Sequence, residues 1–247
     1  MQLTVATWNV LHRIHAENWG ELPALLRMGE AERHRAIAER VWSGGWSVVC
    51  LQEVSGDQLA ALRLCAPRDA HVFEHTYPRV PRLRAANVVS CLVKPTEHLV
   101  TLVSGGGAHV RAAVTFPTDP GKGLLSVLLP SGVVVVNTHV TWGAPAAAQL
   151  LAVAAEARHT EGMAVVCGDF NASAAEVSAG VGPEFNFGQP PAGSLPTRPR
   201  RDGRNKSQHI DHVFTRHGLV GALRVWDAEG LSDHNLVSAT VQSAPAP

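Results

Sequence analysis

The chain has 247 residues, a formal net charge of zero, 45% hydrophobic residues and 17% charged residues. This length suits one large domain, and the ordinary composition excludes fibrous and disordered proteins. The neutral charge argues against a wide surface that coats nucleic acid, because such surfaces carry a basic excess, but it is compatible with a small cleft that grips one or two phosphates.

The cysteines and the apolar runs indicate the cellular setting. The four cysteines form no C-x-x-C pair, so we expect free thiols in a reducing compartment and neither zinc ligands nor disulfides. The first nine residues lack a basic region followed by an apolar core, so we expect no secretory signal. No apolar run reaches the roughly 20 residues that span a bilayer. We therefore expect a cytoplasmic monomer without a membrane span.

The first third of the chain contains two strands and two helices by pattern. Leu3–Val10 is rich in β-branched residues and predicts a strand, and a mixed, loop-like segment follows it. Glu30–Trp42 has apolar residues at helical spacing. Ser47–Leu51 predicts a buried strand, and Ser55 with Gln58 three residues later predicts a capping box at the start of the next helix.

The middle of the chain reads as consecutive strands separated by turn residues. The predicted strands are Val88–Val93, Leu99–Val103, Ala108–Phe116, Leu124–Leu129 and Val133–Val140. Pro145 suits the first turn of a helix that runs to about Thr160, because its fixed φ matches the helix. Met163–Cys167 predicts another buried strand.

The last third predicts one long loop and three strands. Gly180–Ser207 is rich in Gly, Pro and Arg, and loops of that length are usually functional or disordered. Strands are predicted at Ile210–Phe214, Leu219–Val225 and Leu236–Val241. The strands follow one another like hairpins, with few helices, no internal repeat and no linker. This pattern favours one domain over 1–247, an α/β or α+β sandwich with largely antiparallel sheets.

Polar residues that can bind metal or phosphate stand at the ends of several apolar strands. They are Asn9, Glu53, His139, Asp169, Asn171, Asp211, Asp233 and His234. Each one alone has an ordinary explanation as a turn residue, a cap or a structural histidine. Their repeated occurrence at strand ends is the informative observation.

These groups suit a single chemistry. The oxygen ligands of Glu53, Asp233 and the Asn9 carbonyl suit Mg²⁺ or Mn²⁺ better than zinc. Such a metal polarises a phosphoryl oxygen and stabilises a leaving oxygen. Asp211 lies in an apolar strand and needs a partner, which the segment with His234 offers. A carboxylate that is hydrogen-bonded to a histidine fixes its tautomer and favours its charged form.

The sequence resembles the endonuclease/exonuclease/phosphatase superfamily, which includes deoxyribonucleases, apurinic endonucleases, neutral sphingomyelinases, inositol-polyphosphate phosphatases and deadenylases. The resemblance runs from Thr7 to about Val241. Its motifs are Thr-Trp-Asn-Val (7–10), Leu-Gln-Glu-Val (51–54), Asn-Thr-His (137–139), Gly-Asp-Phe-Asn (168–171), Ile-Asp-His-Val-Phe (210–214) and Ser-Asp-His (232–234). The resemblance implies a four-layer α/β sandwich, with two central mixed or antiparallel β-sheets flanked by helices and the active site at one edge.

The resemblance also implies a set of metal ligands and a pair of residues that contact the attacking water and the phosphate. Glu53 would be the principal ligand of the metal, helped by Asn9 and Asp233. Asp169 would orient or deprotonate the attacking water, and Asn171 would hold a phosphate oxygen.

Histidines would form the phosphate-facing side. His234 would contact the phosphate and be oriented by Asp211, and His139 would stabilise developing charge or aid the leaving group. Whether His234 or Asp169 is the base stays open. Asn87 is a further candidate, because residues 86–90 resemble a family strand in which Ala86 replaces the usual Gly.

The segment before the Asp211 strand is the most basic part of the chain. Its candidate substrate-binding residues are Arg198, Arg200, Arg201 and Arg204. Arginine binds phosphate through paired hydrogen bonds, so this segment predicts a phosphate or substrate clamp. A solvated, flexible surface loop is the competing interpretation. Trp142, close after His139, either stacks on a base or sugar ring or packs against the protein.

The main hypothesis is hydrolysis of a phosphodiester by in-line attack of a metal-assisted water. We expect a nucleic acid or nucleotide as substrate, and the neutral charge favours a small or single-stranded one over long duplex DNA. One alternative is a phosphomonoesterase or a phosphodiesterase for phospholipids or small metabolites. Another is a catalytically inactive binding module, which the presence of every expected catalytic residue argues against.

Overall fold

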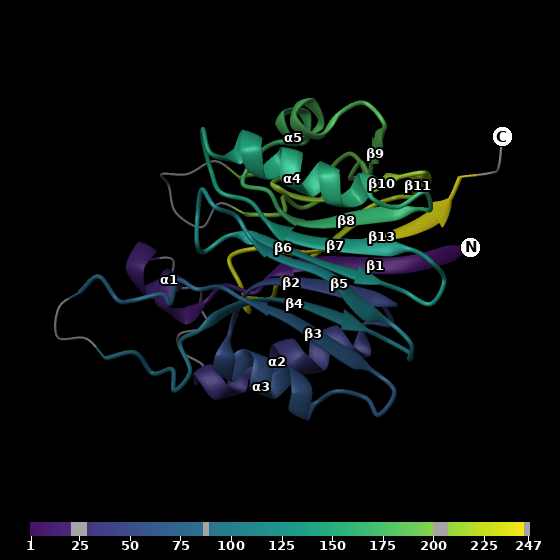
Figure 1. The fold of residues 1–247 in the computed structure, drawn as a ribbon. Helices are drawn as coiled ribbons and strands as arrows, with labels where there is room; N and C mark the ends of the chain where they lie inside the picture. The colour runs from purple at the N-terminus through teal and green to yellow at the C-terminus, as the bar shows by residue number, and fades with distance from the viewer. Residues whose placement is uncertain (21–28, 86–88, 200–206, 245–247) are drawn as a thin grey trace.

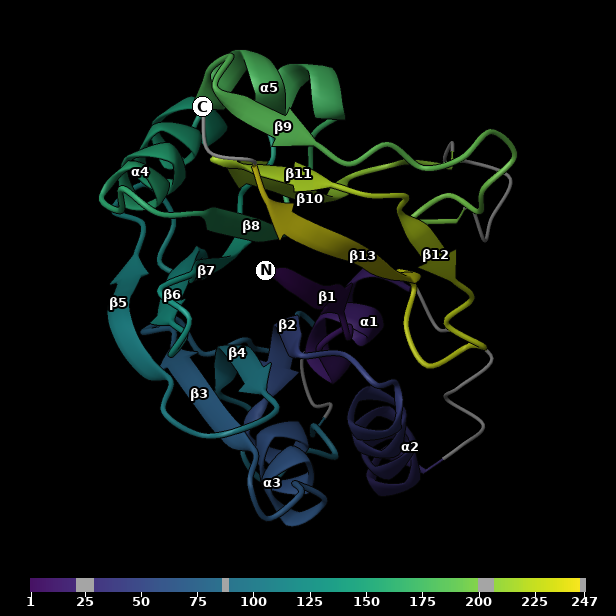
Figure 2. The same ribbon diagram turned by 90° about the vertical axis from the view of Figure 1, so that its right-hand side faces the viewer.

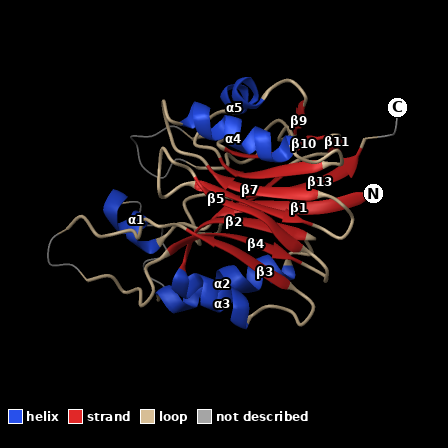
Figure 3. Ribbon diagram, in the orientation of Figure 1, coloured by secondary structure: helices blue, strands red, loops and turns tan. Residues whose placement is uncertain are grey.

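Two β-sheets lie face to face at the centre of the molecule, with helices on the outer face of each (Figure 1). The computed structural model describes residues 1–20, 29–85, 89–199 and 207–244. Colouring by secondary structure shows the layers in the order helices, sheet, sheet, helices (Figure 3). The predicted four-layer α/β sandwich is therefore confirmed.

The first sheet contains both the N-terminal and the C-terminal strand. Its order is β11-β13-β1-β2-β4-β3, and β12 also pairs with β13. The strands are β1 (Gln2–Asn9), β2 (Val48–Ser55), β3 (His71–Thr76), β4 (Glu97–Val103), β11 (Gly218–Val220), β12 (Arg224–Trp226) and β13 (Leu236–Ser243). The helices on this side are α1 (Arg13–Trp19), α2 (Glu30–Ser43) and α3 (Gly56–Leu64). α2 and α3 cover the outer face, and α1 lies at one edge (Figure 1).

The second sheet is built from the middle of the chain. Its order is β5-β6-β7-β8-β10-β9. The strands are β5 (His109–Thr115), β6 (Gly123–Leu128), β7 (Val134–His139), β8 (Ala164–Asp169), β9 (Phe185–Phe187) and β10 (Asp211–Arg216). Helices α4 (Ala146–Arg158) and α5 (Ala174–Val181) cover its outer face (Figure 2). Within the described ranges, no helix is long and apolar enough to cross a membrane.

One parallel pair lies at the centre of each sheet. β1 runs parallel to β2, and β7 runs parallel to β8, while β1, β2, β7 and β8 pair antiparallel with their other neighbours. Asn9 is paired with Gln52, and His139 with Asp169. The polar ends of these strands therefore meet at one edge of the sandwich.

The central strands contribute to two hydrophobic cores each, because successive side chains of a strand point to opposite faces. Val5 and Val135 pack between the sheets. Trp8 packs with Ile37 of α2, and Val136 belongs to the core under α4. Burial of both faces explains why the strands read as nearly continuous apolar runs.

Most predicted elements are present, with ends shifted by a few residues. Ser55 caps α3 as predicted, since its Oγ accepts a hydrogen bond from the Gln58 backbone N–H at 3.1 Å. The Gln58 side chain donates instead to the carbonyl of His34 at 3.1 Å. Only the Ser55 half of the predicted capping box is therefore seen.

The predicted strand Val88–Val93 is wrong. Val88 lies outside the described residues, and 89–93 contains no strand. The backbone N–H groups of Val93 and Lys94 donate to Oδ2 of Asp57 at 2.7 and 3.2 Å. This segment is therefore tied to the start of α3, and its apolar residues do not enter a sheet.

Other differences come from short elements. α1 was not predicted, because its cap is an unusual one: Nδ1 of His12 accepts from the backbone N–H of Ile14 at 3.2 Å. α5, which was not predicted, begins at a capping box between Ser173 and Glu176. The long loop predicted over 180–207 contains β9. The strand predicted at Leu219–Val225 is two strands, β11 and β12.

A buried polar link joins the two sheets near this edge. Asn137 of β7 donates from Nδ2 to the carbonyls of Leu51 and Val100 at 3.2 and 2.9 Å, across the gap between the sheets. Its Oδ1 accepts from Nε2 of Gln52 at 2.8 Å. Both side chains are fully buried. Buried polar groups that are satisfied in this way fix a unique arrangement of the elements that they join.

We predict that Asn137→Leu lowers the free energy of unfolding by about 3 kcal/mol, because it removes the hydrogen bonds that Asn137 makes to the buried Leu51 and Val100 carbonyls and to the Gln52 amide. Urea denaturation measures the change. The control is Thr215→Val, since the buried Thr215 hydroxyl has no hydrogen-bond partner among the described residues. Equal stability of the two variants would contradict the role of the link.

Candidate active site

One cleft, at the edge where β1, β2, β7 and β8 end, contains most of the predicted site residues. Its volume is about 1210 Å³. The predicted residues that line it are Asn9, Glu53, His139, Asp169, Asn171, Arg198, Asp233 and His234. Four predicted substrate-binding residues lie outside the described ranges: Asn87, Arg200, Arg201 and Arg204. Their assignment stays a prediction.

Glu53 is turned out of its strand by an irregularity in β2. The pairing of β2 with β4 shifts register between Leu51 and Val54, and Glu53 has a left-handed φ of 57°. Non-glycine residues adopt this region at a cost, and such residues concentrate at functional sites. The backbone N–H of His12 donates to Oε2 of Glu53 at 3.1 Å. The turn places the Glu53 carboxylate in the wall of the cleft.

Asn9 connects the carboxylates of the two sheets. Its Nδ2 donates to Oε1 of Glu53 at 3.1 Å and to Oδ2 of Asp169 at 2.9 Å. Its Oδ1 accepts from the backbone N–H of Leu11 at 3.0 Å. The amide thus presents its nitrogen to the carboxylates, which suits a residue that positions them. The role of Asn9 as a metal ligand through its carbonyl stays a prediction.

Asp169 and Asn171 form a short polar turn after β8. Oδ1 of Asp169 accepts from the backbone N–H of Asn171 at 3.0 Å, and Asn171 has a left-handed φ of 49°. Nδ2 of Asn171 donates to the carbonyl of Val140 at 3.0 Å. Burial opposes the charge of Asp169, but His234 and His139 outweigh it and hold the pKa of Asp169 below its usual range. Asp169 is therefore a carboxylate at neutral pH.

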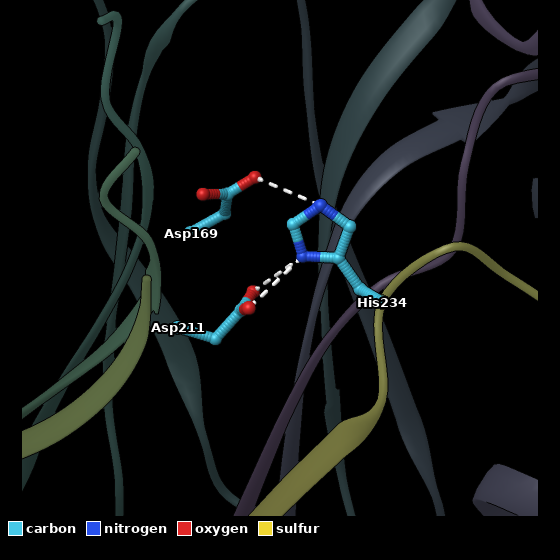
Figure 4. Close-up of side chains that lie close together, drawn as sticks. All are labelled: Asp169, Asp211 and His234. Atoms are coloured by element: carbon cyan, nitrogen blue, oxygen red, sulfur yellow. Dashed lines mark hydrogen bonds and ion pairs between the residues drawn. The ribbon is translucent and has the colours of Figure 1, made fainter. Parts of the chain in front are cut away.

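His234 lies between two buried carboxylates (Figure 4). Its Nδ1 is 2.9 Å from Oδ2 of Asp211, and its Nε2 is 3.8 Å from Oδ2 of Asp169. Burial disfavours the charged ring, but Asp211, Asp233 and Asp169 together raise the pKa of His234 to about 10. The imidazole is therefore a cation at neutral pH, with Asp211 as its closest counter-ion.

The loop that carries His234 is fixed to the end of β1. The hydroxyl of Ser232 donates to the carbonyl of Asn9 at 2.7 Å and accepts from the backbone N–H of His234 at 3.1 Å. The indole N–H of Trp8 donates to the carbonyl of His234 at 2.8 Å. These bonds align the predicted phosphate-facing histidine with the strand that carries Asn9.

His139 and Lys122 place nitrogen groups in the cleft on the side of the second sheet. Nε2 of His139 is 3.4 Å from Oδ2 of Asp169 and 3.9 Å from Oε1 of Glu53. Nζ of Lys122 lies 2.5 Å from the same ring nitrogen. Sequence reasoning missed Lys122, because it lies in a turn. Its position follows from the antiparallel register, in which Gly123 is paired with His139.

Asp233 faces the one predicted clamp arginine that the structure describes. Oδ2 of Asp233 is 3.1 Å from Nη2 of Arg198. The backbone N–H of Arg198 donates to the carbonyl of Gln208 at 3.0 Å, and the reverse bond has the same length. Arg198 therefore stands at the base of the basic segment and inside the cleft, in contact with a predicted metal ligand.

Two further contacts hold residues of the site in place and were not predicted. Oγ1 of Thr197 accepts from the backbone N–H of Asp211 at 3.2 Å. Nε2 of His15 is 3.0 Å from Oε2 of the buried Glu97. Burial opposes protonation of His15, but Glu53 and Glu97 raise its pKa. Such partners are distant in sequence, and a motif does not reveal them.

The donor set suits a hard divalent cation. Asp169, Asp211 and His234 offer ligand atoms that lie within 4.8 Å of one another. His234 is a poor ligand, however, because its raised pKa keeps the ring protonated and a ligating imidazole must be neutral. Glu53 and Asp233 add carboxylate oxygens in the same cleft. An oxygen-rich set of this kind fits Mg²⁺ or Mn²⁺.

Solved structures with the same fold come from bacteria and animals. An endonuclease/exonuclease/phosphatase family protein from Bacteroides thetaiotaomicron has a TM-score of 0.70 at 14% identity, covering 100% of this chain and 99% of its own. An endonuclease/exonuclease/phosphatase from Beutenbergia cavernae has a TM-score of 0.68 at 19% identity, and the match covers 100% of this chain and 72% of that protein. D. rerio TDP2, complexed with a single-strand DNA product, has a TM-score of 0.68 at 15% identity, and the match covers 98% of this chain and 99% of that protein.

Comparison with family models agrees with the fold. No curated protein matches the sequence. The model of the endonuclease/exonuclease/phosphatase family matches residues 6–234, nearly the whole chain, which confirms the resemblance. Members of this family are metal-dependent phosphoesterases and nucleases. The chain therefore belongs to the endonuclease/exonuclease/phosphatase family and is a metal-dependent phosphoester hydrolase.

Proposed function

We propose that this chain hydrolyses a phosphodiester bond of a nucleic acid or nucleotide, with Mg²⁺ or Mn²⁺ as cofactor. One observation carries the proposal. A single cleft holds the carboxylates of Glu53, Asp169 and Asp233 together with the cations of His234 and Lys122. A phosphodiester placed in this cleft would meet both a metal held by carboxylates and hydrogen-bond donors.

Glu53 and Asp233 would hold the metal, and Asn9 would position Glu53. The metal, when bound, polarises a phosphoryl oxygen and lowers the cost of charge on the leaving oxygen. Burial alone would raise the pKa of Glu53, but His15, His139 and Lys122 hold it below its usual range. Glu53 is thus ionised and ready to bind a cation without first losing a proton.

Asp169 would orient the attacking water and accept its proton at a carboxylate oxygen. The charge state of His234 favours this assignment over the alternative, since a ring that is already protonated cannot act as a base. Asp169 is ionised, and its position is fixed by Asn9 and Asn171. Asn171 would in addition hold a phosphate oxygen.

His234 and Lys122 would stabilise the negative charge that develops on the phosphoryl group. Asp211 keeps the His234 ring charged and oriented. Lys122 carries a compact cation beside His139. His139 would then assist the leaving oxygen. Donors that are already in place before the reaction stabilise the transition state without a cost of reorganisation.

The walls of the cleft favour a polymeric anion over a small phosphomonoester. Beyond the central residues, the cleft is lined by Arg79, Arg82, Arg84 and Arg198. This concentration of arginines contrasts with the net charge of zero for the whole chain. A structure of similar fold, D. rerio TDP2, is complexed with a single-strand DNA product.

We expect phosphodiesterase activity that requires metal and falls at least 100-fold in Glu53→Gln, because the variant keeps the shape of the side chain and loses the charge that binds the cation. The assay uses single-stranded and duplex DNA, RNA, nucleotides, phospholipid headgroups and sugar phosphates, with Mg²⁺, with Mn²⁺ and with a chelator. Glu184→Gln, which removes a carboxylate paired with Arg158 outside the cleft, serves as control. Full activity in the chelator, or in Glu53→Gln, would refute the proposal.

We predict that the His234 ring of the metal-free chain stays protonated from about pH 6 to pH 8 and that Asp211→Asn lowers its pKa toward the ordinary 6.5. Nitrogen-detected NMR of the imidazole measures both. Because the folded pKa is raised, this interaction stabilises the fold below pH 6.5, and the contribution disappears as the pH rises through about 10. Asp227→Asn, at an exposed carboxylate, is the control. A wild-type ring that titrates near pH 6.5 would disprove the charge assignment.

Replacement of Lys122 tests the unpredicted cation. Lys122→Met should lower kcat/KM for phosphodiesters by roughly 10- to 100-fold, the loss typical when one donor to the transition state is removed. Lys122→Arg should retain most activity, since it restores the charge. Lys94→Met removes the charge of a lysine that does not line the cleft. The role of Lys122 is refuted if Lys122→Met and Lys94→Met have the same kcat/KM.

A further inference from the structure

Two tryptophan rings stand exposed in the wall of the cleft. Trp19 at the end of α1 is 63% exposed, and Trp142 is 80% exposed. Both line the cleft that contains His139 and Lys122. Large apolar side chains that remain exposed at a concave site are a mark of ligand binding. The catalytic assignments use neither ring.

Trp19 is held in place despite its exposure. The guanidinium of Arg84 lies over the ring, 4.1 Å from its centroid. The neighbouring Asn18 donates from Nδ2 to the carbonyl of Arg82 at 2.9 Å, and its Oδ1 accepts from the backbone N–H of Arg84 at 2.8 Å. These contacts join α1 to a segment more than sixty residues away. The ring is therefore a preorganised platform, which lowers the entropy cost of stacking a ligand on it.

Trp142 comes from the other half of the molecule. It follows β7 of the second sheet, three residues after His139, whereas α1 follows β1 of the first sheet. The backbone N–H of the adjacent Thr141 donates to Oε1 of Gln149 at 2.8 Å, which fixes the turn to α4. Each sheet thus contributes one exposed indole to the shared cleft.

The charges between the two rings suit a polyanion. Arg82 and Arg84 line the cleft on the side of Trp19, and Arg79 lines it near Lys122, where it pairs with Asp119 at 3.0 Å. Lys122 lies beside His139, and His139 precedes Trp142 by three residues. Alternation of cations with exposed aromatic rings is the arrangement by which proteins bind single-stranded nucleic acid: the cations contact phosphates, and the rings stack on bases.

We propose that Trp19, braced by Arg84, and Trp142 are base-stacking platforms for a single-stranded polynucleotide, one on each side of the phosphate that is cut. The inference rests on the proposed function. A duplex keeps its bases stacked on one another, so only unpaired bases offer a face to these rings. Stacking is tolerant of sequence, because every base has an aromatic face, so the proposal includes little base specificity.

A phospholipid surface is the competing occupant, since Val80, Val89 and Val93 are also exposed on the segment that carries Arg84. The nucleic acid is favoured by the position of the rings. Both indoles line the cleft together with the cations and the catalytic carboxylates, whereas Val89 and Val93 do not. A lipid bilayer would instead require the aromatic rings on an outer surface that can lie flat on the membrane.

The test uses the full chain and the variants Trp19→Ala, Trp142→Ala and the double variant. Trp19→Phe and Trp142→Phe restore an aromatic face. Trp226→Ala is the matched control, because Trp226 is 40% exposed on β12, donates to Oγ of Ser238 and does not line the cleft. The readouts are kcat and KM for a single-stranded oligonucleotide and for bis(4-nitrophenyl) phosphate. Fluorescence anisotropy adds the affinity for a labelled oligonucleotide in the presence of a chelator.

We expect each alanine variant to raise the oligonucleotide KM, and to weaken oligonucleotide affinity, by roughly 10-fold. In the double variant, the fold-loss of oligonucleotide affinity should be about the product of the losses in the two single variants. The effect on bis(4-nitrophenyl) phosphate should be much smaller, because this substrate has no chain of bases on either side of its phosphate. The phenylalanine variants should recover most of the loss, and Trp226→Ala should match the wild type.

The outcomes separate the two proposals. If the wild type cleaves no phosphodiester but still binds the oligonucleotide through the two indoles, the proposed activity fails and the stacking platforms stand. If the wild type cleaves the oligonucleotide and Trp19→Ala and Trp142→Ala behave like Trp226→Ala, the platforms are refuted. Loss of binding to anionic phosphatidylserine vesicles in the alanine variants, with unchanged oligonucleotide affinity, would assign the surface to lipid. A wild type that neither binds nor cleaves the oligonucleotide would overturn both proposals.

Discussion

The hydrogen bonds of the Asn137 side chain hold the two sheets at a fixed distance and register at the edge where the cleft opens. Nδ2 reaches the carbonyls of Leu51 and Val100 in the first sheet, and Oδ1 receives the amide of Gln52. An apolar contact between two sheets fixes their separation and leaves them able to slide, because dispersion has little directional preference, whereas a satisfied polar link has one geometry. Glu53 follows Gln52, and His139 follows Asn137 by two residues. The distance between Glu53 and His139 across the cleft therefore depends on this link.

The buried charged groups of the site keep one another ionised, because each has neighbours of opposite charge. Asp169 and Glu53 are kept ionised by neighbouring cations, and His234 is kept protonated by neighbouring carboxylates. Each group would be neutral in isolation at this depth, because a buried charge is costly without a partner. The charges thus exist because they were brought together by strands from both sheets. Removal of one partner changes the protonation of the others, so these residues act as a unit.

The central strands that end at the cleft were predicted better from the sequence than the short elements around them. Strands such as β1, β7 and β8 are buried on both faces, so their apolar runs are unmistakable, and the polar residues at their ends mark the site. The short elements α1 and β9 depend on contacts that a pattern does not contain: a histidine cap for α1 and packing of Phe187 against Phe214 for β9. Lys122 was missed for a related reason, because only the pairing of Gly123 with His139 brings it to the cleft. Local patterns identify strands, whereas register and tertiary partners are properties of the folded chain.

The left-handed backbone of Glu53 has a consequence for laboratory evolution of this chain. Glycine would adopt a φ of 57° at position 53 without steric cost, so Glu53→Gly would relieve local strain while removing the carboxylate that we propose as a metal ligand. Selection for thermal resistance alone would therefore accept changes at this position that selection for turnover rejects. Libraries designed to increase the thermal stability of the protein should keep residue 53 constant. The persistence of glutamate at this position in natural variants would indicate selection for chemistry rather than for folding.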